Sequence, residues 1–145
     1  MNAYAPGRTY VFSERFHKAV KLIHRALTES DLSVVSEFDT TGRACAEPGK
    51  RPEPSRILLV DSPLLAFEAQ ALDRAAGVFL PLHVFVGADG DRTQVFIANS
   101  SDLFHGRLPL GAAGPVERLR NRISLALESV LIRADGSHEN EGEEQ

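Results

Sequence analysis

Five side chains of types that bind ligands or transfer protons stand within, or just after, segments that favour β-structure. In chain order they are Asp39, Asp61, Ser62, His83 and Asn99. A carboxylate or an imidazole on a rigid strand can act as a general acid or base, or can orient a ligand. We therefore take these five residues as the candidate ligand-binding positions of the chain.

Asp39 and His83 also have structural explanations. Asp39 ends a strand-like segment, where its carboxylate can accept a hydrogen bond from the backbone of Thr40 or Thr41 in a turn. A lone histidine within a strand is more often a hydrogen-bonded structural residue than a ligand. His83 and Phe85 share one face of their strand, opposite Leu82, and we expect that face to border a cleft or a dimer contact.

Asp61 and Ser62 stand directly before Pro63, a pattern typical of a helix start with Ser62 as the N-cap. A helix N-terminus can hold an anion. Asp61 argues against a phosphate there, because it would repel the anion and can bind the free amides itself. Asn99 opens a polar stretch that ends at Asp102, and this stretch is also typical of an N-cap before a short helical turn.

The sequence favours neither a metal nor a cofactor. Cys45 is the one cysteine, so an intramolecular disulfide and a two-thiolate zinc site are excluded. In a flexible polar loop Cys45 is most simply an incidental exposed residue. The histidines form no HxH or HExxH motif, and His17 and His24 lie two helical turns apart, too far for one ion.

Charge argues against nucleic acid and membrane partners. The 145 residues carry 16 basic and 20 acidic side chains, a formal charge of -4, and the last eleven residues hold acids but no Lys or Arg. The remaining body is almost neutral and gives no strong field for a polyanion. The apolar stretch 77–86 is too short to span a bilayer, and no signal peptide is visible. We expect a cytoplasmic protein.

The N-terminal half favours alternating strands and a helix. Residues 8–12 predict a short strand, and apolar residues at helical spacing predict an amphipathic helix over 14–29, with Ser13 as its N-cap. Residues 32–38 predict a second strand, with Val34 and Phe38 on one face. Residues 39–54 are rich in Pro and Gly and predict a long loop. The apolar run 56–60 predicts a strand buried on both faces.

The C-terminal half continues the alternation. A helix is expected from Pro63, closed by Gly77. Residues 82–86 and 92–98 flank an Asp-Gly pair and predict a hairpin. After a connector over 103–114, a last helix is expected over 115–132, and the acidic residues after it predict disorder.

The order β-α-β-β-α-β-β-α predicts an α+β fold, a mostly antiparallel sheet covered by the first and last helices. We expect a single domain over residues 8–132. Residues 1–7 would form an N-terminal arm and residues 133–145 an acidic disordered tail.

Three segments resemble the bacterial and archaeal domain of unknown function 302 family. They are SERFHKAVKLIHRAL, SVVSEFD and ILLVDSPLLAFEAQALDRAAGVFLPLHVFV, and the match lies in their order and spacing over residues 10–130. The chain departs from the family pattern at two places. Asp61 and Ser62 stand where many members have Gly or Cys and then Asn, and Leu82 and His83 stand where many have Cys and Asn.

The resemblance implies a compact α+β domain, a homodimer and no established activity. Together with the small number of ionisable residues, it leads us to expect a non-catalytic module that binds a small apolar ligand or a protein. The alternative is a hydrolase- or isomerase-like enzyme that uses Asp39, Asp61 and His83. That alternative requires the three side chains to converge within hydrogen-bond reach.

Overall fold

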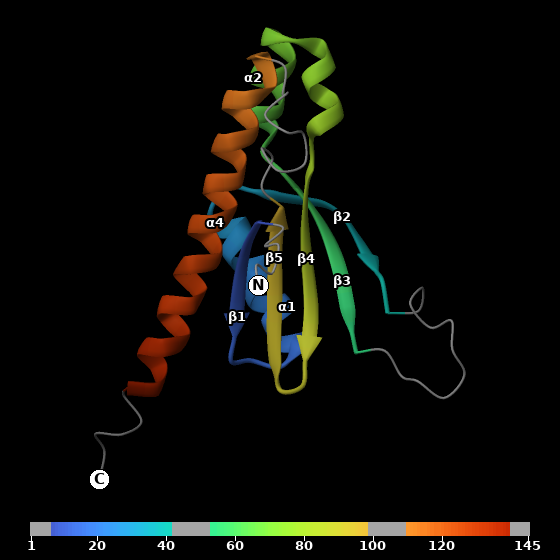
Figure 1. The fold of residues 1–145 in the computed structure, drawn as a ribbon. Helices are drawn as coiled ribbons and strands as arrows, with labels where there is room; N and C mark the ends of the chain where they lie inside the picture. The colour runs from blue at the N-terminus through green and yellow to red at the C-terminus, as the bar shows by residue number, and fades with distance from the viewer. Residues whose placement is uncertain (1–6, 42–52, 99–109, 140–145) are drawn as a thin grey trace, which may run out of the picture.

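The computed structural model describes residues 7–41, 53–98 and 110–139, and within the last range it describes the side chains of residues 114–131. Its strands are β1 (Gly7–Phe12), β2 (Ser33–Asp39), β3 (Ser55–Asp61), β4 (Leu82–Asp89) and β5 (Arg92–Ala98). Its helices are α1 (Phe16–Glu29), α2 (Pro63–Leu72), the 3-10 helix η1 (Arg74–Phe79) and α4 (Leu110–Glu139), all shown in Figure 1.

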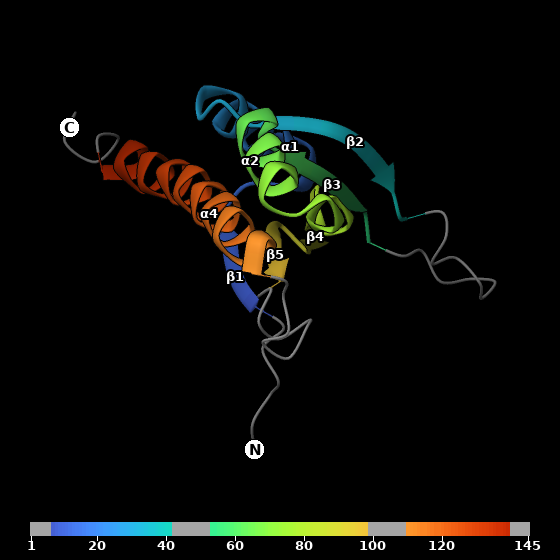
Figure 2. The same ribbon diagram turned by 90° about the horizontal axis from the view of Figure 1, so that it is seen from above.

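The five strands form one sheet in the order β1-β5-β4-β3-β2, and every neighbouring pair is antiparallel. Figure 2 shows that α1 and α4 lie on the same side of this sheet. The predicted α+β fold is therefore confirmed. The other side of the sheet carries no helix in the described part of the chain, so the two faces differ in what covers them.

The core lies between the sheet and the two long helices. From α1 it takes the stripe that the sequence predicts, including Ile23 and Leu27, and from α4 it takes Leu119 and Ile123, all fully buried. The sheet contributes every second residue of its inner strands, such as Leu58 on β3. Alternation in a strand leaves the intervening residues on the uncovered side, which we call the open face.

Strand β3 corrects one expectation. The apolar run 56–60 predicts burial on both faces, yet only Leu58 and Val60 are buried, and Ile57 and Leu59 are half-buried. The apolar run is real, but the helices cover only one side of the sheet. Ile57 and Leu59 therefore belong to the open face.

Strand β2 corrects another. The sequence places Val34 and Phe38 on one face, but the register with β3 shifts between Val34 and Ser36. Such a bulge adds one residue to a strand and reverses which side the following residues face. As a result Val34 lies opposite Val60 of the core, and Phe38 lies opposite Ile57 of the open face.

The helix ends also differ in detail from the sequence prediction. Arg15, rather than Ser13, is the N-cap of α1, and it makes no side-chain capping bond. The helix that begins at Pro63 ends at Leu72, and Asp73 then accepts a hydrogen bond from the amide of Ala75 to start η1. Gly77 lies inside η1 and closes no helix, because the Asp73 cap restarts the chain as a tighter helix.

Helix α4 is longer than predicted at both ends. It begins at Leu110, so Pro115 lies inside it, and it runs to Glu139, which places part of the expected disordered tail in a helix. Residues 140–145 lie outside the described part of the chain.

Candidate functional site

The most distinctive surface of the molecule is a row of side chains that crosses the open face at right angles to the strands. The register places Phe38 opposite Ile57, Ile57 opposite Phe85, Phe85 opposite Phe96 and Phe96 opposite Thr9. Four of the five are large and apolar. Antiparallel sheets with one solvated face normally turn polar side chains outward, so this row needs an explanation.

The neighbouring rows of the open face are short or weakly polar. On one side Ser55 faces Gly87, which faces Gln94, which faces Val11. On the other side Ser36 faces Leu59, which faces His83. None of the residues in these three rows is Lys, Arg, Asp or Glu. The centre of the open face is therefore apolar and lacks formal charge.

The aromatic side chains of the row are already ordered against the sheet. The ring centroids of Phe85 and Phe96 lie 6.0 Å apart. A Cβ atom on Gly87 would come within 3.0 Å of Phe85 Cε1, so the ring packs over this glycine. Phe85 is nevertheless 37% exposed, Phe38 41% and Val11 47%. Phe85 and Phe96 therefore present apolar area that is already packed against the sheet.

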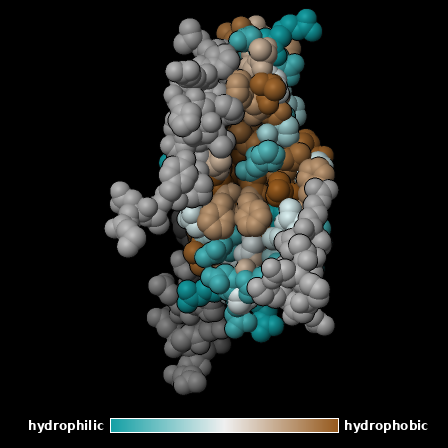
Figure 3. Space-filling view, turned by 45° about the vertical axis from the view of Figure 1, so that its right-hand side comes forward, coloured by the Kyte–Doolittle hydropathy of each residue, from teal (hydrophilic) through white to brown (hydrophobic). Residues whose placement is uncertain are grey.

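Figure 3 views this side of the molecule. Hydrophobic residues gather in its middle, and hydrophilic ones follow toward the lower end of the view. Isolated exposed apolar residues are ordinary, whereas a contiguous apolar patch marks a contact surface.

A second exposed apolar surface lies on α2 and η1, at the upper end of the view in Figure 1. Leu64, Phe67, Leu72 and Val78 are 63% to 80% exposed there. The Glu68 carboxylate of α2 binds Arg118 of α4 at 2.6 Å and gives this surface a charged neighbour.

Asp39 has the structural role that its turn position suggests. Its Oδ1 accepts a hydrogen bond from the amide of Thr41 at 2.9 Å. That bond, with smaller help from the Arg56 guanidinium, holds the pKa of the Asp39 carboxyl below its usual value.

Asp61 and Ser62 both act at the start of α2. The Ser62 hydroxyl accepts a hydrogen bond from the amide of Leu65 at 3.4 Å, which confirms the predicted N-cap. Asp61 Oδ1 accepts from the amide of Ser62 at 2.8 Å. Ser62 is buried and also contacts Arg122 of α4, so its oxygen points toward the helices and away from the open face.

Burial gives Asp61 a pH signature. Partial burial raises the pKa of its carboxyl, and the bond from the Ser62 amide lowers it to a smaller extent. A raised folded-state pKa contributes stability that is complete below the unfolded pKa and is lost as pH rises through the folded pKa. We predict that Asp61→Asn gains stability relative to the parent chain as pH rises from 3 to 7, measured by urea unfolding.

The matched control is Asp39→Asn, because the folded-state pKa of Asp39 shifts the other way. The parent chain gains stability from Asp39 as pH rises above the folded pKa, so this variant loses stability relative to the parent over the same range. The prediction is contradicted if the free energy of unfolding of Asp61→Asn, relative to that of the parent chain, stays constant or falls as pH rises from 3 to 7.

His83 lies where the alternation places it, exposed on the open face beside the apolar row. Asp61 stands two residues beyond Leu59, the partner of His83, so Asp61 and His83 are diagonal neighbours with Cα atoms about 7–8 Å apart. No hydrogen bond or ion pair joins their side chains in the described part of the chain. His83 is thus a polar group at one margin of an apolar surface.

The register keeps Asp39 away from the other candidates. Asp39 lies opposite Arg56 at one end of the β2–β3 pair, and Asp61 lies opposite Ser33 at the other end. Asp61 lies five positions beyond Arg56 along β3, which corresponds to about 17 Å. The three side chains that the enzyme hypothesis requires therefore do not converge. Asn99 and Cys45 lie outside the described residues.

The structure does bring together an imidazole and a carboxylate that the sequence analysis did not pair. His24 Nε2 lies 3.0 Å from Glu37 Oε2, and Arg56 Nη1 donates to Glu37 Oε1 at 2.9 Å. His24 and Glu37 border an open groove of about 430 Å³ between α1 and β2. The two are 13 residues apart, one on a helix and one past the bulge, so no sequence motif could reveal the pair.

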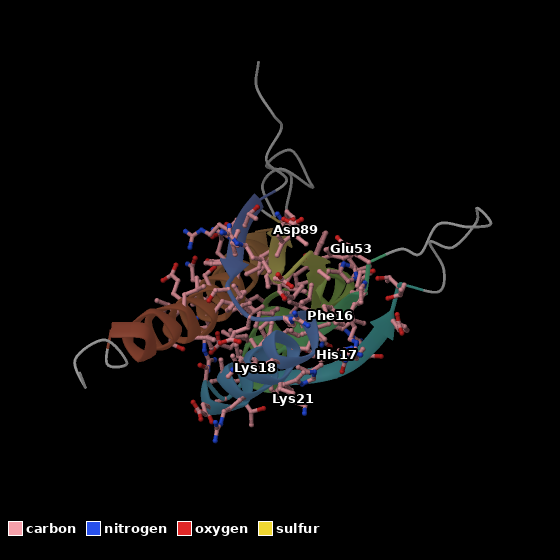
Figure 4. The ribbon with its side chains drawn as sticks, turned by 90° about the horizontal axis from the view of Figure 1, so that it is seen from below. Phe16, His17, Lys18, Lys21, Glu53 and Asp89 are labelled. Atoms are coloured by element: carbon pink, nitrogen blue, oxygen red, sulfur yellow. The ribbon has the colours of Figure 1, made fainter. Side chains whose placement is uncertain are left out.

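Two features bear on charged and membrane partners. Figure 4 shows Lys18 and Lys21 on α1, on the helical side of the sheet. Lys18 pairs with Glu14 at 3.2 Å and Arg25 with Glu29 at 3.6 Å, so these two basic residues of α1 are neutralised locally. Within the described ranges no helix is long and apolar enough to cross a bilayer, and no three His, Cys, Asp or Glu residues gather as metal ligands.

Comparison with known proteins gives two matches. The family model described as "Domain of unknown function DUF302" matches residues 8–130. The crystal structure of an uncharacterized conserved DUF302 protein from Bacillus stearothermophilus matches with a TM-score of 0.72 and 17% identity, over 83% of this chain and 94% of that one. At that identity the likeness shows the fold. None of the curated proteins matches.

Proposed function

The chain belongs to the family described as Domain of unknown function DUF302, and from this premise we propose that it is a homodimeric, non-catalytic module that binds an apolar ligand or a protein surface. Its contact surface is the open face of the sheet. The observation that carries this proposal is the continuous row from Phe38 to Phe96, which presents ordered apolar side chains across the strands.

Two further observations support binding over catalysis. The carboxylates of Asp39 and Asp61 stand at opposite ends of a strand pair, and each already accepts a backbone amide. General acid–base catalysis needs its groups within reach of one substrate atom. At the margin of the described open face His83 and Asp61 are diagonal neighbours, but no hydrogen bond joins their side chains.

The same face is a poor match for nucleic acid. Aromatic side chains on a sheet can stack bases, but binding a strand also requires cations to neutralise its phosphates. The three central rows hold no Lys or Arg. The basic residues of α1 lie on the other side of the sheet and are largely paired.

The proposal is tested with an apolar fluorescent dye, anilinonaphthalene sulfonate, added to dilute protein. The parent chain is expected to enhance dye fluorescence, and Phe85→Ser to lose most of that enhancement, because the variant removes the centre of the row. Circular dichroism confirms that the variant folds.

The control is Phe67→Ser, which removes an aromatic side chain that is 71% exposed on α2. It is expected to keep most of the dye signal. If Phe67→Ser abolishes the signal and Phe85→Ser leaves it, the binding surface lies on α2 and the proposal for the open face fails.

A further inference from the structure

We propose that the occupant of the open face is a second copy of this chain, so that two sheets stack face to face across a two-fold axis. This inference rests on the proposed function, which leaves open whether a ligand or a protein covers the face. The occupant is therefore a protein, and it binds in one arrangement. In that arrangement the apolar row of each copy lies against the apolar row of the other.

Charge favours a second copy as the occupant. The formal charge of -4 is carried mainly by the acidic last eleven residues, and the rest of the chain is almost neutral. The three central rows of the open face contain no Lys, Arg, Asp or Glu. A two-fold axis parallel to the strands brings each row against the same row, and an uncharged row then meets itself without placing like charges together.

The other exposed surfaces fit self-association less well. Pairing through the outer edge of β2 would bring Glu37 and Asp39 of both copies into one contact. That edge also carries the bulge between Val34 and Ser36, and bulges disfavour edge pairing. The surface on α2 and η1 has the charged pair of Glu68 and Arg118 beside it.

Area also favours a second copy. Five strands about 4.8 Å apart and about seven residues long make a face of about 500 Å² per copy, which holds the three uncharged central rows and, at its ends, Asp61, Asp89 and Arg92. Two such faces bury about 1,000 Å² in total, which reaches the lower range for a specific interface. A small ligand would cover only part of the row, whereas a second sheet at about 10 Å covers all of it.

The order of the aromatic side chains also favours a second copy. Phe85 packs on Phe96 and over Gly87, so both rings already occupy fixed positions in the single chain. Association through such side chains costs less conformational entropy than association through the freely exposed residues of α2. Phe85 lies near the centre of the face, where interface residues contribute most to affinity.

The test is sedimentation of the full chain over a range of concentrations, with two open-face variants and two controls. We expect the parent chain to be a dimer that dissociates on dilution. Phe85→Asp and, independently, Phe38→Lys should each weaken the dimer at least about thirtyfold, because each places a charge in the apolar row that the second copy covers. Phe67→Asp on α2 and Val35→Lys on the β2 edge should change its dissociation constant by less than about threefold.

Three outcomes overturn the proposal. They are a parent chain that stays monomeric at all concentrations, a dimer that survives both open-face variants, and a dimer that a control variant weakens as much as Phe85→Asp does. Circular dichroism of each variant shows that the fold is intact.

Dye binding separates failure of this inference from failure of the proposed function. If a second copy covers the face, dye fluorescence per chain falls as the dimer forms. A monomer that binds dye through Phe85 keeps the open face as a binding surface and rejects the second copy as its occupant. A chain whose dye binding does not depend on Phe85 rejects both.

Discussion

Leu58→Ala is expected to lower the free energy of unfolding by about 3 kcal/mol, the usual cost of emptying a fully buried leucine site. Leu58 has no exposed surface and lies on β3 between Glu37 and Val84, facing the helices. Removing its side chain leaves a cavity between the sheet and the helix layer, which the packed neighbours can fill only in part. Urea unfolding of dilute protein measures the change.

The adjacent residue provides the control. Leu59 has the same side chain one position along β3, but it points to the open face and is half-buried. Leu59→Ala is expected to cost about 1 kcal/mol, because less apolar area leaves water when this residue folds. Dilute protein is essential, since a second copy on the open face would bury Leu59 as well. Equal losses for the two variants contradict the assignment of the faces.

Arg122→Met is expected to cost about 2 kcal/mol, again by urea unfolding, because it removes charged hydrogen bonds that join three helices. Arg122 Nη2 donates to the carbonyl oxygen of Ser30, just after α1, at 2.9 Å, and Nη1 donates to the Ser62 hydroxyl at the start of α2. Methionine keeps much of the apolar stem, so the loss reports on the guanidinium.

Arg118→Met is the matched comparison on the same helix. Its guanidinium binds Glu68 at 2.6 Å, but the two side chains are 55% and 35% exposed. Exposed ion pairs contribute at most about 1 kcal/mol. A loss at Arg118 as large as the loss at Arg122 would mean that solvent exposure does not distinguish the two contacts.

The order of elements and the core follow from local patterns. The stripe that includes Ile23 and Leu27, the Ser62-Pro63 start of α2 and the Asp89-Gly90 hairpin are all read from neighbouring residues, and the structure confirms each of them. Gly90 adopts the positive φ of 62° that such a turn needs. Signals of this kind depend on a few neighbouring residues, so they can be interpreted without knowledge of the fold.

Predicting the open face requires information that is not local in the sequence. Alternation shows that His83 and Phe85 share a face, and this prediction is confirmed. Alternation does not show that Phe38, Ile57 and Phe96 join them, because that follows from the register of four strand pairs. The β2 bulge reverses the assignment of Phe38, and no residue type announces it. Because no helix covers this side of the described sheet, Ile57 and Leu59 of the apolar run 56–60 are only half-buried.

The strand order has a consequence for how the chain assembles during synthesis. Strands β2 to β5 pair with their neighbours in sequence, but β1 pairs only with β5, and Phe12 lies opposite Thr93. When β1 leaves the ribosome, its only partner in the described sheet has yet to be translated. The meander from β2 to β5 can therefore form before β1 docks, and closing the long loop between them adds entropic cost to that last step.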